Sequence, residues 1–225
     1  MRRLTILAAA GLMALSGMAF AAPELQRVRG TIDKIDGDTL TIATTEGTSE
    51  TVSVAGAKFA WVAKSSLDAI RDGVFIGTAT KGENPMTALE VVIFPESMRG
   101  TAEGHYGWDM IPDPLAGGGK VKSAMTNGTV KAGGAGAPKV KSAMTNGTVS
   151  STGGTGAERM LTVTYGKDGA KQIAVPPQAP IVAFEPADRA ILAKGSKVFV
   201  VAARDGGTLD GKLVGVGKDG LTPPM

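Results

Sequence analysis

The sequence predicts a mainly β protein of two small five-stranded OB-like barrels, each with one short helix. Three observations predict this fold class. Short segments alternate apolar and polar residues with a period of two, as half-buried strands do. The same order of segments occurs twice, and the chain has 32 Gly but only 4% aromatic residues, which suits short strands and turns. The predicted parts are a signal peptide at 1–22, a first barrel with a C-terminal strap at 23–114, a flexible Gly/Lys linker at 115–145 and a second barrel at 146–225.

The N-terminus has the pattern of a secretory signal peptide. Arg2 and Arg3 precede an apolar run at 4–20, which ends in small residues. A membrane-anchoring helix is the alternative, but the run is short for a span and is interrupted by glycine and serine. The pattern therefore predicts cleavage near Ala21 or Ala22 and export to a bacterial periplasm. No later stretch reaches membrane-spanning length, so the mature protein is expected to have no transmembrane span.

The first barrel is predicted from its alternating strands and turn residues. Val28, Gly30 and Ile32 alternate with polar residues, and Leu40 and Ile42 do the same in the next strand. The expected strands are 28–32, 40–42, 52–62, 75–80 and 88–94, with a short helix at 65–73 that starts at a serine cap and stops at a glycine. Three strands, a helix and two strands follow one another as in an OB barrel.

The last third of the chain repeats this order in different residues. Leu161-Thr162-Val163 corresponds to Leu40-Thr41-Ile42 at an offset of 121 residues. The expected elements are strands at 146–149, 161–163, 173–175, 198–202 and 212–216, and a helix at 186–195. The scarcity of aromatic residues means that each core must come from Val, Ile and Leu.

The linker contains an exact repeat. Residues 120–130 and 139–149 both read KVKSAMTNGTV, with a Gly/Ala-rich spacer between them. Two copies with a glycine spacer cannot stack into a solenoid, which needs at least three units. The repeat is therefore interpreted as a tandem duplication within a mobile linker, whose second copy opens the second barrel.

Charge and composition exclude several functions. The chain has 24 Lys+Arg and 21 Asp+Glu, but residues 23–114 carry a net charge of −6 and residues 115–149 contain five lysines and no acid. A nucleic-acid site on an OB barrel needs a basic groove with stacking aromatics, so no nucleic-acid partner is expected. With no Cys, one His and no nucleophile or phosphate-loop motif, the chain is not expected to be an enzyme and no cofactor is predicted.

The densest group of unusual residues follows the first barrel. It holds one of two Trp, one of two Tyr and the single His between residues 96 and 110. Tyr106 and Trp108 are the expected aromatic anchors for a partner, with Arg99 and Glu96 as polar neighbours. The alternative is an ordered strap whose aromatic residues pack on the barrel.

The same segment offers candidate metal ligands. Glu103, His105 and Asp109 carry N and O donors for a divalent cation, and His105 with Met110 would suit copper. A histidine that only donates a hydrogen bond or faces solvent is the alternative reading.

The strings GTIDKIDGDTLTI, VFIGTA and EVVIFPESMRGTAEGHYGWDMIPD, followed by MTNGTV, resemble a family of exported bacterial proteins with tandem OB-like small barrels of unknown function. The resemblance covers nearly all of the mature chain and implies the same fold and compartment. Some relatives bear the name of metal-transporter permeases. A permease needs several apolar spans, and this chain has none beyond its signal segment, so the resemblance implies nothing about transport.

Together these observations predict a periplasmic, non-catalytic binding or scaffold protein whose partner is an envelope protein or a small ligand. The alternative function is metal binding, to copper or another divalent cation, through the segment around His105.

Overall fold

The protein is mainly β, as the sequence predicts. The computed structural model describes residues 24–109, 111, 113, 143–153, 158–205 and 207–225. Within these ranges thirteen strands form one sheet, and the helical elements are single 3-10 turns. None of the helices in these ranges has the length and apolar character needed to cross a membrane. The predicted signal peptide, Met110 and most of the predicted linker lie outside the described residues.

The first half of the chain supplies seven strands. They are β1 (Glu24–Asp36), β2 (Thr39–Thr44), β3 (Ser49–Ser53), β4 (Lys58–Lys64), β5 (Phe75–Lys81), β6 (Met86–Ile93) and β7 (Gly104–Gly107). The 3-10 turns η1 (Leu67–Ala69) and η2 (Glu96–Met98) follow β4 and β6.

The second half supplies six strands. They are β8 (Ala143–Gly153), β9 (Arg159–Tyr165), β10 (Gly169–Val175), β11 (Ile181–Ala187), β12 (Lys197–Asp205) and β13 (Thr208–Gly217). The turns η4 (Arg189–Ile191) and η5 (Lys218–Gly220) follow β11 and β13, so the order of elements is that of the first half.

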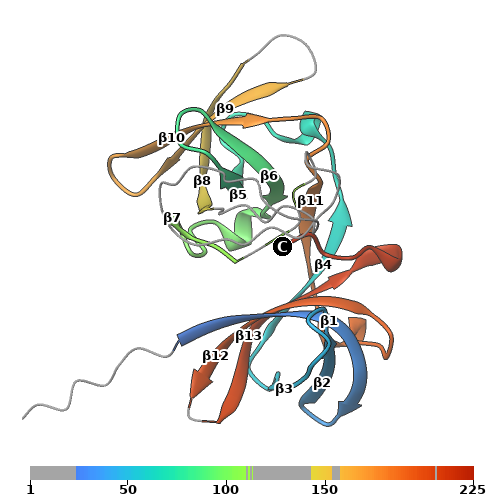
Figure 1. Ribbon diagram of the computed structural model, residues 1–225. Helices are drawn as coiled ribbons and strands as arrows, with labels where there is room; N and C mark the ends of the chain where they lie inside the picture. The colour runs from blue at the N-terminus through green and yellow to red at the C-terminus, as the bar shows by residue number, and fades with distance from the viewer. Residues whose placement is uncertain (1–23, 110, 112, 114–142, 154–157, 206) are drawn as a thin grey trace, which may run out of the picture.

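Ten of these strands close into two five-stranded rings (Figure 1). Ring one consists of β1, β2, β3, β13 and β12, each paired with the next and β12 with β1. Ring two consists of β8, β9, β10, β6 and β5 in the same way, with β5 paired to β8. The neighbours within each ring are antiparallel except for β3 with β13 and β10 with β6.

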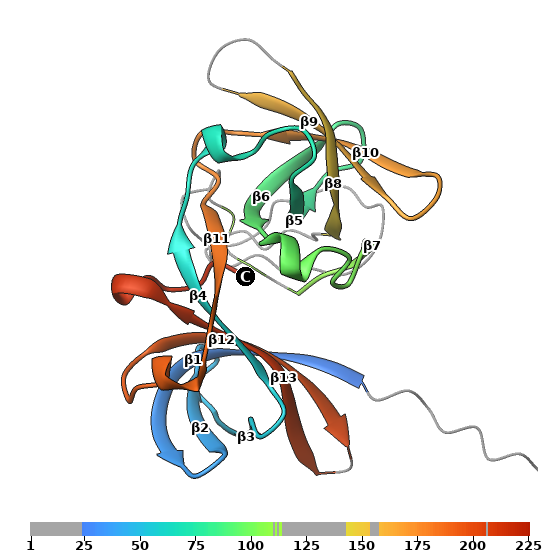
Figure 2. The same ribbon diagram turned by 180° about the vertical axis from the view of Figure 1, so that it is seen from behind.

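Each ring contains strands from both halves of the chain. The sequence predicts consecutive barrels at 23–114 and 146–225, whereas the hydrogen bonds join β1–β3 to β12 and β13, and β8–β10 to β5 and β6. The exchange happens at β4 and β11, which pair antiparallel with each other and carry the chain from one ring to the other (Figure 2). Local alternation predicts where strands occur, but it does not select the half of the chain that supplies their partners.

Three apolar clusters hold these elements together. One fills ring one around Ile32, Leu40 and Val200, and another fills ring two around Ile76 and Val163. The third lies between the rings, and we call it the inter-ring layer. It contains Ala60, Val62, Ala79, Leu89, Val92, Trp108, Ile111, Met144, Val182, Phe184, Phe199 and Met225.

The expected helices are much shorter in the structure. Of 65–73 only η1 is helical, and the side chain of Ser66 makes no capping hydrogen bond. Of 186–195 only η4 is helical, with the Asp188 side chain accepting from Ala190 N. Neither turn buries a residue, so no apolar face stabilises a longer helix.

The expected strand at 52–62 is interrupted. Residues 54–57 form a turn that separates β3 from β4, and the Ala57 amide donates to the Val54 carbonyl oxygen. This break frees β4 from ring one's β2–β3 hairpin, so that it can pair with β11 instead.

Two glycines occupy corresponding places where strands approach closely. A Cβ added to Gly30 would lie 2.1 Å from the carbonyl oxygen of Ala43, and one added to Gly147 would lie 2.2 Å from that of Thr164. Both glycines precede a register shift in their strand. Only a residue without a side chain fits at these two positions.

Candidate ligand-binding site

Two arginines of β1 point away from the core of ring one. Val28 faces inward, and because side chains alternate along a strand, Arg27 and Arg29 face the inter-ring layer. Their Nη1 atoms each lie 2.8 Å from a carboxylate oxygen of Asp109, which follows β7. The guanidinium of Arg27 lies 3.9 Å from the ring centroid of Trp108, and that of Arg29 lies 5.2 Å from that of Phe199.

The cluster pairs two positive charges with two anionic groups. Two guanidinium groups share the carboxylate of Asp109. Nε of Arg29 also donates to the main-chain oxygen of Met225, which in this chain is a carboxylate oxygen. Charge that is only partly exposed, as here, needs a counter-charge to be stable.

A buried carboxyl group lies near this cluster. Glu90 of β6 is 1% exposed, and neither of its carboxyl oxygens has a hydrogen-bond partner among the described residues. Burial raises the pKa of Glu90 to about 8, while the positive charge of Arg29 lowers it and the negative charge of Asp109 raises it. The carboxyl group is therefore mostly protonated at pH 7.

The fold does not require a carboxyl group at this place. Glu90 lies opposite Ala79, directly before a register shift between β5 and β6. In ring one, Leu213 lies opposite Val201 before the corresponding shift between β12 and β13. Because an apolar residue fills that place in ring one, packing alone does not explain Glu90.

Other buried polar atoms in the described structure also lack partners. They are Nη2 of Arg29, Nε1 of Trp108 and Oδ1 of Asn146. Buried polar groups in folded proteins are nearly always hydrogen-bonded, to protein, water or ligand. Trp108 belongs to the inter-ring layer and Arg29 is packed over Phe199 of the same layer, so two of the three unpartnered atoms lie at this layer.

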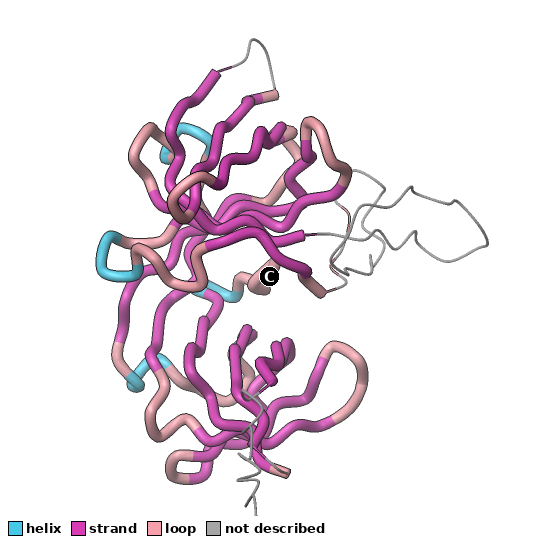
Figure 3. Tube along the Cα trace, turned by 90° about the vertical axis from the view of Figure 1, so that its left-hand side faces the viewer, coloured by secondary structure: helices cyan, strands magenta, loops and turns pink. Residues whose placement is uncertain are grey.

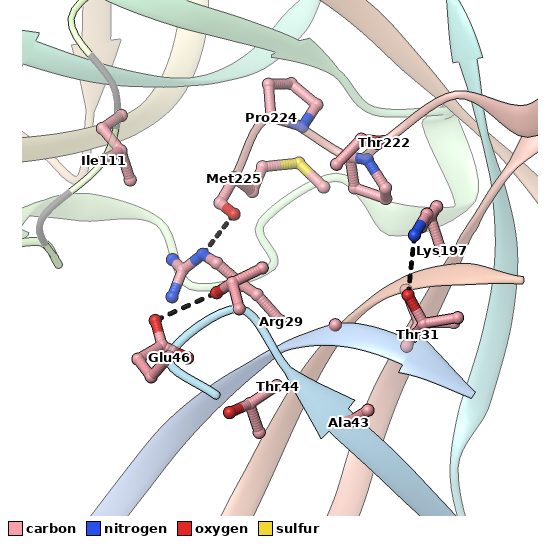
Figure 4. Close-up of a pocket in the computed structure, with 14 residues that line it drawn as sticks. Arg29, Thr31, Ala43, Thr44, Glu46, Ile111, Lys197, Thr222, Pro224 and Met225 are labelled. Carbon is pink, nitrogen blue, oxygen red and sulfur yellow. Dashed lines mark hydrogen bonds between the residues drawn. The ribbon is translucent and has the colours of Figure 1, made fainter. Parts of the chain in front are cut away.

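A pocket of about 510 Å³ opens beside Arg29 (Figure 4). It is formed by β1, β2, the turn after β2, the start of β12 and the segment 222–225. Its lining residues are Arg29, Gly30, Thr31, Ala43, Thr44, Thr45, Glu46, Ile111, Lys197, Val198, Thr222, Pro223, Pro224 and Met225. The end of the chain lies between the two rings, as Figure 3 shows.

The pocket combines apolar walls with polar groups at defined positions. Nε of Arg29 donates to the main-chain carboxylate oxygen of Met225, the last residue, and Nζ of Lys197 donates to Oγ1 of Thr31 over 2.8 Å. The apolar wall comes from Val198, Ile111 and the two prolines of the 222–225 segment. Such a lining suits a small ligand with an apolar body and a polar end.

The four residues predicted to contact a partner make contacts within the protein itself. Arg99 binds the Glu96 carboxylate through two hydrogen bonds of 2.6 and 2.7 Å, and it also donates to Thr148 Oγ1 and to the Gly73 carbonyl oxygen. It thus fastens η2 to ring two. Trp108 is only 8% exposed, and half-buried Tyr106 accepts a hydrogen bond from Asn146, so both aromatic residues lie against the inter-ring layer.

Three of the four predicted metal ligands lie in the described structure, and each of them contacts a different partner. His105 Nδ1 lies 2.8 Å from Thr145 Oγ1, Glu103 accepts from the Gly166 amide, and Asp109 pairs with the two arginines. Burial lowers the pKa of His105, and so does the charge of Lys171. Met110 lies outside the described residues. The described part of the chain contains no group of three or more His, Cys, Asp or Glu that could hold a metal ion.

Sequence reasoning missed Arg27, Arg29 and Glu90. A visible signal existed for Glu90, because it is the one charged residue in the apolar run 88–94. No comparable signal distinguishes the two arginines, which alternate with apolar residues as any exposed pair on a strand would.

The comparisons with known proteins add no relative. No protein-family model, no curated protein and no solved structure matches this chain.

Proposed function

We propose that this protein is an exported, non-catalytic binding protein of the bacterial cell envelope, built from two OB-like barrels, which holds a small ligand in the pocket beside Arg29. The observation that carries the proposal is the pocket of about 510 Å³, which has apolar walls and a guanidinium at its inner end. Its volume lies in the usual range for small-molecule sites.

The order of strands supports the OB-like assignment. Ring one runs from β1 through β2 and β3 to β13 and then to β12, and β3 with β13 is its one parallel pair. Ring two has the same order. OB barrels are five-stranded Greek-key barrels that bind ligands on an outer face of their strands, as the pocket on β1 and β2 would.

The composition of the first 22 residues supports export. A basic start, an apolar run and small residues before Pro23 form the pattern of a cleaved secretory signal. Intact mass measurement on protein from the periplasmic fraction tests this part of the proposal. Loss of the first 21 or 22 residues is expected, whereas retention of the whole run would contradict it.

A pocket-filling variant tests ligand binding. Ala43 is exposed and lines the pocket, so Ala43→Trp should obstruct the pocket without disturbing either core. The matched control is Ala170→Trp, which places the same side chain at an exposed position on β10, outside the pocket lining. The probe is N-phenyl-1-naphthylamine, an uncharged apolar dye whose fluorescence rises on burial.

The wild-type protein and Ala170→Trp are expected to bind the dye equally. Ala43→Trp is expected to bind it at least about tenfold more weakly, because the indole ring occupies the pocket and a loss of about 1.4 kcal/mol of binding free energy already gives that factor. Equal binding by all three proteins, or binding by none, would overturn the proposed pocket function.

A further inference from the structure

We propose that the place of β8 in ring two is a binding site for either copy of the repeated segment, so that residues 124–130 can replace residues 143–149. Residues 143–149 form the first part of β8, whereas residues 124–130 lie outside the described part of the chain. Both segments read AMTNGTV and both follow KVKS, at a distance of 19 residues. The inference concerns ring two and does not depend on the pocket beside Arg29 in ring one.

The pairing partners of β8 bind the part of the strand that is repeated. β5 pairs with residues 143–148 along one edge of β8, and β7 pairs with residues 143–146 along the other edge. β9 continues along the edge of β7, starting opposite Thr148. The strands that surround β8 therefore meet a sequence that the chain contains twice.

The side chains of this part of β8 make contacts that depend on residue type. Met144 is buried in the inter-ring layer, and Val149 is fully buried in the core of ring two. Nδ2 of Asn146 donates to the Tyr106 hydroxyl group over 3.0 Å. The corresponding residues of the first copy have the same identities and are Met125, Val130 and Asn127. The first copy can thus make the same contacts.

Gly147 makes the site selective for this sequence. A Cβ added at Gly147 would lie 2.2 Å from the carbonyl oxygen of Thr164 in β9. Only a segment with glycine at this position fits between the neighbouring strands. The first copy has Gly128 there, so it satisfies the strictest requirement of the site.

The chain before β8 is long enough for the exchange. The Asp113 carboxylate lies 2.7 Å from Nζ of Lys81, the residue after Thr80, and Thr80 lies opposite Ala143. Asp113 is therefore close to the start of β8. From residue 113 to Ala124 the chain advances by 11 residues. Extended chain of that length spans about 36 Å, which is ample.

The exchange lengthens one connection as it shortens another. The segment that leads into β8 loses the 19 residues that the segment between β8 and β9 gains. The entropy of loop closure changes only slowly with loop length, so the two effects nearly cancel. Connection length therefore favours neither copy strongly.

The two arrangements differ after the repeat. Ser150 and Thr152 are exposed residues of β8, and Lys131 and Gly133 would take their places. The Ser150 hydroxyl group would no longer donate to the Thr162 carbonyl oxygen, and glycine is a poor strand former. The second copy is thus the more stable occupant, and the first copy replaces it when the second is impaired.

The exchange also moves positive charge. Lys131, Lys139 and Lys141 precede β8 when the second copy is bound, and they follow the repeated part of the strand when the first copy is bound. β8 has 11 residues, which corresponds to about 36 Å along the strand. The exchange therefore carries three lysines past the length of the repeated strand.

Glycine substitutions in the full chain test the exchange. Gly147→Val blocks the second copy and Gly128→Val blocks the first. Gly128→Val alone should leave the urea midpoint of unfolding unchanged. Gly147→Val should lower the midpoint by less than about half of the decrease in the double variant, because only the double variant leaves ring two without a fitting strand.

Gly30→Val is the matched control. A Cβ at Gly30 would lie 2.1 Å from the carbonyl oxygen of Ala43, which is nearly the same close approach as at Gly147. The sequence of β1 occurs only once in the chain, so no second copy can replace it. Gly30→Val should therefore lower the midpoint at least about twice as much as Gly147→Val does.

Thiol labelling identifies the copy that is bound. The chain has no Cys, so Val149→Cys and Val130→Cys each introduce a single thiol, and a buried cysteine behaves as a small apolar residue. Adding Gly147→Val should speed maleimide labelling of Val149→Cys at least about tenfold, because this position then leaves the core. The same addition should slow the labelling of Val130→Cys at least about tenfold.

Each of three results contradicts the exchange. The first is an equal decrease of the midpoint in Gly147→Val and in the double variant. The second is a labelling rate of Val130→Cys that does not fall when Gly147→Val is added. The third is a fall of that rate only in protein that elutes as a dimer, since the copy would then enter a second molecule. Unfolding cannot protect a thiol, so the labelling of Val130→Cys is decisive even if the double variant does not fold.

Discussion

Val62 of β4 lies directly opposite Phe184 of β11, where the two strands pass each other between the rings. Both side chains are buried, at 0% and 4% exposure. The Phe184 ring also meets that of Phe94, with centroids 5.3 Å apart and planes at 74°. β4 and β11 are the strands through which each half of the chain passes from one ring to the other. The contact between Val62 and Phe184 therefore connects the two crossing strands.

Phe184→Ala should therefore weaken the whole fold rather than one ring. Removing a buried phenylalanine side chain lowers the free energy of unfolding by about 3–5 kcal/mol. Urea unfolding followed by circular dichroism should give a single transition at a lower midpoint. Leu25→Ala is the control, since Leu25 is 56% exposed and should change stability by less than about 0.5 kcal/mol. Two separate transitions in the variant would contradict the coupling of the rings.

Sequence patterns predicted the elements of this fold better than their partners. Leu40 and Ile42 are fully buried in β2, as their alternation indicates. The pattern in β1–β3 fits pairing with β5 and β6 as well as with β12 and β13, because alternation indicates which residues of a strand are buried but not which strand lies beside it. Which pair is used depends on the path of β4 and β11, and that path follows from contacts far apart in the sequence.

The candidate site was predicted less well for a related reason. Trp108 was identified as an unusual residue, but its burial against Arg27 and Phe199 depends on the meeting of two rings. Asp109 was identified as a possible metal ligand, and its carboxylate instead holds two arginines that lie about 80 residues earlier in the chain. Residue type indicated that this segment matters, while its chemistry depends on tertiary contacts.

Gly30 offers a sharp test of the strand register in ring one. A methyl group there would meet the Ala43 carbonyl oxygen at 2.1 Å, which forces β1 and β2 apart. Gly30→Ala should thus lower the free energy of unfolding by about 2–3 kcal/mol or more. Gly56→Ala is the matched control, because an added Cβ at Gly56 meets nothing within 4 Å and its φ is not positive. Equal stability of the two variants in urea unfolding would show that the register of β1 and β2 is different.

Glu90 should make the stability of the protein depend on pH. Below pH 4.5 its carboxyl group is protonated in both the folded and the unfolded chain, so ionisation has no effect on folding. Between pH 4.5 and about 8 the unfolded chain loses the proton while the folded chain keeps it, and stability falls as the pH rises. The full loss, reached above about pH 8, is up to about 5 kcal/mol.

Glu90→Gln keeps the shape of the side chain and cannot ionise. Relative to the wild type, the variant should become steadily more stable from pH 4.5 to 8, as urea unfolding at several pH values would show. Glu96→Gln is the control, because its pKa is lowered by the hydrogen bond from Arg99 and its effect should be small and opposite in sign. A stability difference between wild type and Glu90→Gln that does not change with pH would mean that Glu90 is ionised in the folded protein.

Asp109 should stabilise the region where the two rings meet. Asp109→Asn removes the carboxylate that two arginines share, so it leaves their partly buried positive charges less well compensated. The free energy of unfolding should fall by about 2–3 kcal/mol, less than for a fully buried pair because Asp109 is 33% exposed. Asp36→Asn, which removes an exposed ion pair with Lys34, should leave the free energy of unfolding nearly unchanged. Equal stability of the two variants in urea unfolding would show that the arginines do not depend on the carboxylate of Asp109.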